Sequence, residues 1–472
     1  MGKGSEATDW ALAEFGAANL GDARRDARLV QLARQLGQRP EASLPRALQD
    51  RAALKAACRF FDNADIAHEK ILAAHVASTM GRMQGHEVIL AVQDTTFINY
   101  ATHEHTQGLG PLDDKGSLGM ICHGTLAFTA ERLPLGVLGL RLWAREKDAP
   151  KRATRRQRPI EQKESYKWID GLQAAARVVG AGRRVVSVAD RESDVYEFFA
   201  KAREWGVDVL TRAAWNRNVD EAQGRLFETL AAAPIMASKK VHLPARKGQP
   251  ARVARLKVRA CPVILQSPLN GSARGLAPIA LWGVWAYEPD APAGVEPLDW
   301  KLLTTVPVTC NEEAIERLDW YAVRWGIEVW HRVLKSGCRI EQRHLESFER
   351  LARLFTLYAV IAWRILYATL LARSVPQIPC TAILNEDEWQ ALYCRVHQRA
   401  TPPATAPPLR QALRWIAQLG GFLGREADGE PGTQTLWKGF QELIPSTEMY
   451  RIMKQHPSHA TTRPTSKRKT CG

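Results

Sequence analysis

The sequence predicts an α/β protein, in which helices flank a mixed β-sheet and helical regions occupy both ends of the chain. Between residues 87 and 214, apolar runs of strand length alternate with the 3.6-residue spacing of amphipathic helices. A strand-rich block follows at 214–306, and helical spacing returns after it. This order of elements is typical of a mixed sheet and not of an all-helical or all-β protein.

The individual elements follow from the same patterns. Strands are expected at 87–100, 123–131, 133–144, 183–190 and 207–214, and helices at 163–179, 192–206, 312–335 and 348–373. Three consecutive strands predict an antiparallel meander, and the later alternation with helices predicts parallel addition to it. The Pro-rich segment 401–408 predicts a loop.

Four regions result from this arrangement. They are a helical N-terminal region at 1–70, a mixed-sheet domain at 71–213 and 307–375, a β-rich basic insertion at 214–306, and a helical C-terminal region at 376–472 that ends in a basic tail. A chain of 472 residues is long enough for each region to bury a core.

Composition indicates a globular protein with an acidic partner. The net charge is +15 and the pI is near 9.6, which favours nucleic acid or an anionic membrane surface as partner. The most apolar stretch, 354–363, is too short to span a bilayer, and the N-terminus lacks the apolar core of a signal peptide. The eight cysteines have no metal-ligand spacing and predict reduced thiols in the cytoplasm.

The positive charge is concentrated in the insertion. No Asp or Glu occurs from Thr229 to Tyr287. Within this stretch, Arg255, Lys257 and Arg259 alternate with apolar residues, which predicts a strand with one cationic face. Such a face could be merely solvated, but solvated strands usually mix charges, so we expect it to contact phosphates.

The segment "YAVRWGIEVWHRVLK" at 321–335 predicts a mostly buried helix that carries one polar stripe. At about 100° per residue, Tyr321, Arg324, Glu328 and Lys335 fall within a stripe roughly 60° wide. The stripe could be an internal salt-bridge ladder, since Arg324 and Glu328 are four residues apart. The alternative is that it faces a polyanion and its metal ions, but this segment alone favours the ladder, because structural ion pairs are common.

Two predicted strands end in aspartate. Asp94 closes "VILAVQD" and Asp190 closes "VVSVAD", where a carboxylate is costly unless it is solvated, paired or metal-bound. Asp190 could also cap the helix that follows. Together with Glu328, these carboxylates could gather in one cleft and hold two divalent ions about 4 Å apart, the arrangement used in phosphodiester chemistry. Mg²⁺ suits such oxygen ligands.

These motifs resemble those of bacterial DDE transposases of the insertion-sequence-four family, to which the transposon-five transposase belongs. The resemblance rests on "QDTT" around Asp94, "ADRESD" around Asp190, and the signature Y-x2-R-x3-E-x6-K. "LGDARRDARL" near the N-terminus and "PLDWKLLTT" before the signature also match, and the similarity spans residues 8–445. The resemblance implies a ribonuclease-H-like core with a mixed five-stranded sheet, an N-terminal DNA-binding domain and a C-terminal region that pairs two subunits.

The resemblance also implies roles for individual residues. Asp94, Asp190 and Glu328 would be catalytic and would bind Mg²⁺, with Mn²⁺ as a substitute. The residues expected to contact DNA are Arg24, Arg25, Arg28, Arg212, Trp300, Tyr321, Arg324, Trp325 and Lys335, the two tryptophans by handling a flipped base. From the residues alone, Arg24, Arg25 and Arg28 could equally belong to a plain surface helix, because Asp22 and Asp26 offset their charge. His103 and His105 could be metal ligands, but loop histidines are usually just solvated.

The implied activity is cut-and-paste transposition. A homodimer in the bacterial cytoplasm, close to the nucleoid, would bind the inverted-repeat ends of its own element, cleave them through a hairpin and join them to target DNA. Two alternatives are a metal-dependent DNA nuclease of the same fold and an inactive DNA-binding regulator. Regulators of that kind often lack the N-terminal arm or a metal ligand, and this chain has both.

Overall fold

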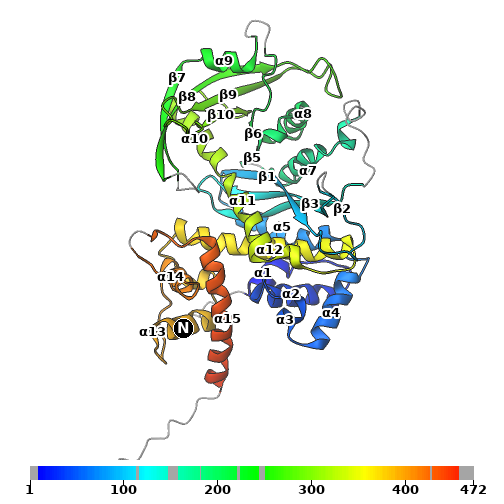
Figure 1. Ribbon diagram of the computed structural model, residues 1–472, viewed down its shortest axis with the longest axis vertical. Helices are drawn as coiled ribbons and strands as arrows, with labels where there is room; N and C mark the ends of the chain where they lie inside the picture. Colours follow the sequence, from blue (N-terminus) through cyan, green and yellow to red (C-terminus); the bar gives the residue numbers. More distant parts are fainter. Residues whose placement is uncertain are drawn as a thin grey trace, which may run out of the picture. The chain divides into compact units, whose positions relative to one another are not determined.

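The computed structural model describes residues 9–112, 116–146, 158–180, 182–219, 224–243, 250–425 and 428–455 (Figure 1). The chain forms two compact units, Trp10–Ser374 and Met1–Asp9 with Val375–Gly472. The basic C-terminal tail expected from the sequence lies outside the described residues, as do the basic residues at 151–157.

The larger unit is built on a mixed sheet whose central strands confirm the predicted five. They follow the spatial order β4-β3-β1-β5-β6. Their bounds are β1 Val88–Asn99, β3 Leu118–Thr129, β4 Pro134–Trp143, β5 Arg184–Ala189 and β6 Asp208–Arg212. β3 is antiparallel to β1 and β4, whereas β5 is parallel to β1 and β6. This is the predicted meander with parallel addition.

The strands of the insertion continue this sheet and do not form a sheet of their own. β10 (Asp299–Thr304) pairs with β6, and β9 (Ile279–Tyr287), β8 (Arg252–Leu265) and β7 (Ile235–Leu243) follow in order. β10 therefore covers the edge of β6, which would otherwise leave unpaired backbone groups. The short strand β2 (Gly110–Pro111) also pairs with β3, and the described residues form a sheet of ten strands.

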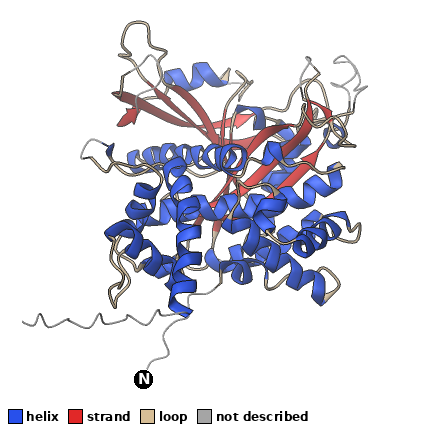
Figure 2. Ribbon diagram, turned by 60° about the horizontal axis from the view of Figure 1, so that its bottom comes forward, coloured by secondary structure: helices blue, strands red, loops and turns tan. Residues whose placement is uncertain are grey.

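Helices lie against both faces of the sheet (Figure 2). One face packs on α7 (Tyr166–Ala176) and α8 (Tyr196–Trp205), whose Trp168, Leu172 and Phe199 join Ile89 and Val209 in a buried apolar cluster. The other face contacts α10 (Asn311–Ala322), α11 (Trp325–Arg332) and α12 (Phe348–Ser374). The insertion adds α9 (Leu226–Ala232), and the short helix η1 (Ile160–Gln162) precedes α7.

The predicted single helix over 321–335 is wrong, because the segment breaks into three pieces. α10 ends at Ala322 and α11 begins at Trp325. A π-helical turn, η3, then covers Val333–Gly337, and the 3-10 helix η4 covers Ile340–Gln342. The periodicity of the segment is helical throughout, but tertiary packing decides where the chain turns.

α12 is long and apolar enough to cross a membrane by length and composition alone. It has 27 residues, and 83% of its most apolar window is buried within the structure. Arg353 on this helix donates to the carbonyls of Ile66 and Phe61 from the N-terminal region. α12 therefore packs as a core helix, as the sequence predicts.

The N-terminal region is helical, as expected. Its helices are α1 Trp10–Phe15, α2 Ala23–Gln38, α3 Leu44–Leu48, α4 Arg51–Asp62 and α5 His68–Arg82. A buried polar network joins α1 to α5 and to the start of β4. Glu14 accepts from His75 Nδ1 at 2.6 Å and from Arg82 at 2.6 and 3.0 Å, while the Val137 amide donates to His75 Nε2.

We expect Glu14→Ala to lower the free energy of unfolding by roughly 3 kcal/mol, because it leaves a half-buried guanidinium and a buried imidazole without their partner. The pKa of His75 is lowered by burial, so the imidazole is neutral and cannot replace the lost charge. Urea denaturation at neutral pH measures the change. Glu69→Ala, which removes an exposed carboxylate from α5, the helix that carries His75 and Arg82, is the control. Equal losses in the two variants would contradict the prediction.

The smaller unit is helical, as predicted. It contains η5 (Cys380–Ala382), α13 (Glu386–His397), α14 (Leu409–Leu419) and α15 (Thr433–Gln455). Asn385 and Glu388 form a capping box at the start of α13. α13 and α14 both pack on α15, and the Pro-rich segment 401–408 is the connection between α13 and α14.

Candidate active site

Strand pairing places Asp94 and Asp190 side by side. Val92 of β1 pairs with Val188 of β5, and each aspartate lies two residues further along its strand direction. Parallel neighbours are about 4.8 Å apart, and residues at the same level point to the same face. Val188 pairs in turn with Leu210 of β6, so Arg212 stands at the same level beyond Asp190. The two predicted aspartates and Arg212 thus form one row across three strands.

Two glycines let α11 lie close over this row. A Cβ on Gly326 would lie 2.6 Å from the ring of Phe128 on β3, and a Cβ on Gly124 would lie 2.9 Å from Trp330 of α11. Gly124 is also the residue of β3 that pairs with Asp94. Trp330 is held from behind by donating Nε1 to the Ala359 carbonyl of α12 at 2.9 Å. These contacts fix the helix that carries Glu328 above the strand that carries Asp94.

Arg324 connects two of the three predicted carboxylates. Its Nη2 donates to Glu328 Oε1 at 2.7 Å, and its Nη1 lies 3.8 Å from Asp94 Oδ2. Of the salt-bridge ladder considered for this stripe, the described residues contain the Arg324–Glu328 ion pair. Lys335 lies 3.7 Å from Glu341, and the Tyr321 ring lies edge-on to Trp300 at 5.9 Å. Arg324 therefore supplies the positive charge that the carboxylates need when no metal is bound.

The two aspartates of this site bind protons more tightly than usual. The pKa of Asp94 is raised to about 6, mainly by burial and to a lesser extent by the charges of Asp190 and Glu328, although the Thr95 amide and Arg324 act to lower it. Burial also raises the pKa of Asp190, although its side chain accepts from the Glu192 amide at 2.8 Å. That bond caps the 3-10 helix η2 (Arg191–Ser193). Asp190 therefore caps this short 3-10 helix and not α8, the helix predicted to follow it, which begins at Tyr196 with Val195 at its N-cap.

His331 is a residue of this site that the sequence analysis did not single out. Its Nδ1 lies 3.9 Å from Asp94 Oδ2, its Nε2 is buried without a hydrogen-bond partner, and its ring packs on Trp330. Burial, followed by Lys335 and Arg324, lowers its pKa to about 3, so the imidazole is neutral. The only sequence signal was its position one helical turn after Glu328.

The remaining predicted DNA contacts surround the site. Arg212 donates to the Asp299 carbonyl at 2.9 Å, and Trp325 is 48% exposed at the start of α11. Tyr321 is buried, and the Arg324 guanidinium lies 5.9 Å from its ring. Burial raises the pKa of the Tyr321 phenol, so it stays protonated and can donate to a phosphate.

The three N-terminal arginines lie on α2, apart from the carboxylates in sequence and element. Arg24 is paired with Asp22, yet its side chain is 92% exposed. Arg25 forms an ion pair with Asp65 at 2.8 Å, and Arg28 donates to Gln31 at 2.8 Å. Arg25 is therefore partly committed to a structural contact, and Arg24 is the most accessible of the three.

Two further expectations concern metal ligands away from the site. His103 is buried and stacked on His344 with 3.9 Å between ring centroids, so the expectation of a solvated loop histidine is wrong for it; His105 is exposed. Within the described residues, all seven cysteines are free thiols.

The carboxylates of this site are candidate ligands for a divalent cation. Among the residues that the structure describes, no three His, Cys, Asp or Glu side chains already converge as a metal cluster. The donor set nevertheless fits, because Asp94 and Asp190 lie at the same level of neighbouring strands and Arg324 places its positive charge between Asp94 and Glu328. Oxygen donors of this kind suit Mg²⁺ or Mn²⁺.

Comparison with protein families gives three matches. Residues 7–66 match a transposase DNA-binding domain, residues 167–364 a transposase DDE domain, and residues 360–458 a transposase Tn5 dimerisation domain. The three matches stand in the order that the sequence analysis expected. The chain belongs to the DDE transposases of the Tn5 type.

The transposase is therefore a DNA-cleaving and strand-transferring enzyme with a ribonuclease-H-like core, which binds DNA, forms homodimers and uses a divalent metal ion. The DDE match contains Asp190 and Glu328 but begins after Asp94, whose place in the site rests on strand pairing. The dimerisation match runs to residue 458, beyond the end of the resemblance noted in the sequence.

Proposed function

We propose that this transposase moves its element by cut-and-paste transposition, with Asp94, Asp190 and Glu328 as the metal-binding carboxylates. The observation that carries the proposal is the Arg324 guanidinium, which links Glu328 of α11 to Asp94 of β1 beside the aligned Asp190. When bound, Mg²⁺ or Mn²⁺ would activate the attacking oxygen and neutralise charge on the leaving oxygen.

The chain's own residues would position the DNA. Arg324 would exchange Glu328 for a phosphate, with Tyr321, Lys335 and Arg212 as further phosphate contacts around the same row. Trp325, which is half exposed, and Trp300 would stack on a base displaced from the duplex. Arg24, Arg25 and Arg28 would contribute to recognition of the inverted-repeat ends from α2.

The reaction would have four steps. Water cleaves one strand at each end and frees a 3′-hydroxyl, which attacks the opposite strand to form a hairpin and releases the flanking DNA. A second water opens the hairpin, and the 3′-hydroxyl then attacks a phosphodiester of target DNA. Each step exchanges one oxygen for another at phosphorus, so the same carboxylate row serves all four.

The proposed organisation follows the predicted regions. Residues 1–70 would recognise the ends, 71–213 with 307–375 would perform catalysis, 214–306 would extend the sheet, and 376–472 would pair two subunits in the synaptic complex. As a DNA-binding enzyme the transposase is expected in the cytoplasm, and we propose that it works at the nucleoid.

The test uses linear DNA that carries the inverted repeats flanking the gene, incubated with the full chain and Mg²⁺. We expect nicks at the ends, hairpins and joined products, all of which disappear in EDTA. Cleavage without joined products would support a nuclease, and binding without cleavage would support a DNA-binding regulator. Either outcome would overturn cut-and-paste transposition.

A further inference from the structure

The insertion strands separate their cations between the two faces of the sheet. Along β8, Ala254, Leu256 and Val258 are buried, whereas Arg255 and Lys257 are exposed, so the predicted alternation is confirmed. The adjacent residues Lys239 and Lys240 of β7 likewise point to opposite faces. The two faces differ in whether acidic side chains neutralise these cations.

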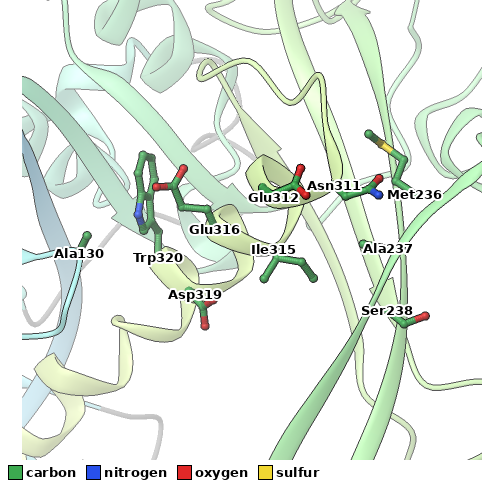
Figure 3. A pocket seen from close by; sticks show the side chains of 10 residues that line it. All are labelled: Ala130, Met236, Ala237, Ser238, Asn311, Glu312, Ile315, Glu316, Asp319 and Trp320. Atoms are coloured by element: carbon green, nitrogen blue, oxygen red, sulfur yellow. The ribbon is translucent and has the colours of Figure 1, made fainter.

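On the face that α10 covers, the cations are neutralised within the chain. Lys239 donates to Asp319 of α10 at 2.7 Å, and Arg252 forms an ion pair with Glu288. A groove of about 700 Å³ lies between α10 and β7 on this side (Figure 3). Glu312, Glu316 and Asp319 line it, so this side of the insertion repels a polyanion.

On the opposite face, Lys240, Arg255 and Lys257 form what we call the cationic face. All three are exposed, and no acidic side chain in the described part of the chain pairs with any of them. The strand register sets Lys240 of β7 directly opposite Arg255 of β8. Like charges in directly opposite positions destabilise a sheet, so this arrangement costs stability unless an anion is bound.

The neighbours of the cationic face keep it open and positive. Lys257 pairs with Tyr287 of β9, whose ring packs at a tilt against Trp285, with 4.5 Å between the ring centroids. Lys301 of β10 lies 4.8 Å from the Trp285 ring, and Arg259 donates to the Ala233 carbonyl at the end of α9. The aromatic rings and α9 therefore cover the part of this face next to β8, and Lys240, Arg255 and Lys257 remain exposed.

We propose that Lys240, Arg255 and Lys257 bind target DNA through its phosphates, as a duplex-binding surface separate from the catalytic row. The three cations contact phosphates equally well on any sequence, whereas recognition of an element end requires contacts to bases. A surface of this chemistry suits the DNA partner whose sequence is not fixed. The role of the bound duplex as target rests on the proposed function, but the binding itself does not.

The first test measures binding of a random-sequence duplex without repeats, in EDTA, across a range of salt concentrations. Each phosphate contact contributes about 0.9 to the slope of log K against log salt. We expect the triple variant Lys240→Gln, Arg255→Gln, Lys257→Gln to reduce that slope by about 2.7. Lys239→Gln, the neighbouring cation that Asp319 already neutralises, is the matched control and should keep the wild-type slope. An unchanged slope in the triple variant would overturn the proposal.

A second readout separates DNA binding from a structural role. Lys240→Gln removes one partner of the like-charge pair, so we expect a higher melting temperature together with weaker duplex binding. A lower melting temperature with unchanged binding would show that Lys240 serves the fold, and would contradict the proposal.

A third arm identifies which duplex is held. With end-bearing DNA and a separate target, the triple variant should give a lower ratio of joined to cleaved products than wild type. If instead its defect grows with the length of flanking DNA beyond the end, the surface holds the donor flank and the assignment to target is wrong. Absence of cleavage by the wild type would refute the proposed function and leave the salt-slope result standing.

Discussion

Glu328→Gln is expected to abolish end cleavage while the protein remains folded and able to bind DNA. The substitution keeps the size of the side chain and removes its charge. If this costs about 4 kcal/mol of the charge stabilisation that a bound metal gives the transition state, cleavage slows by about 10³-fold. Single-turnover cleavage of end-bearing DNA in Mg²⁺ measures the loss.

DNA binding should be as tight in Glu328→Gln as in wild type, or tighter, because Arg324 loses a competing carboxylate at 2.7 Å. Glu312→Gln removes an exposed carboxylate from α10 and is the control for a change in net charge. Cleavage near the wild-type rate in Glu328→Gln would show that Glu328 is only a structural ion-pair partner of Arg324 and not a metal ligand.

Asp94→Asn is expected to abolish cleavage and, in the metal-free protein, to raise stability at neutral pH. The pKa of Asp94 is raised from 3.8 to about 6, mainly by burial, so the folded state binds this proton more tightly than the unfolded state. The resulting stabilisation is complete below the unfolded pKa and is lost as the pH rises through about 6. A shift of this size corresponds to about 3 kcal/mol.

Urea denaturation in EDTA between pH 4 and pH 8 tests this prediction. Wild type should lose stability across that range, and Asp94→Asn should lose less and be the more stable protein at pH 8. Identical pH dependence in the two proteins would show that Asp94 is not the buried carboxylate responsible. Mg²⁺ should stabilise the wild type more than the variant, because only the wild type keeps the ligand.

The strands and the two aspartates could be predicted because their signals are local. A buried strand is a short apolar run, and a carboxylate that ends it is conspicuous. The prediction failed where the outcome depends on distant partners. The helical periodicity of 321–335 does not encode the break at 323–324, and the sequence patterns made no prediction for the pairing of β10 with β6, because both depend on residues distant in the chain.

The site shows the same division between local and distant signals. The i, i+4 spacing of Arg324 and Glu328 predicted their ion pair, and the structure contains it at 2.7 Å. The second contact of Arg324, with Asp94, joins residues that are far apart in the sequence, so no local pattern could predict it. His331 was overlooked for that reason. The ion-pair and metal-site interpretations of the stripe are compatible. The Arg324 guanidinium supplies, between Glu328 and Asp94, the positive charge that a bound metal ion would otherwise supply.

Because hydrogen bonding is continuous from β1 to β8, the sheet fixes the distance between these two strands. Five inter-strand steps separate β1, which carries Asp94, from β8, which carries Arg255 and Lys257. At about 4.8 Å a step, this is about 24 Å. Asp94 lies on the face that α11 covers and the cationic face lies on the opposite one. Since a paired sheet does not stretch, a duplex bound at β8 would therefore be held at a fixed distance from the carboxylate row and on the other side of the sheet.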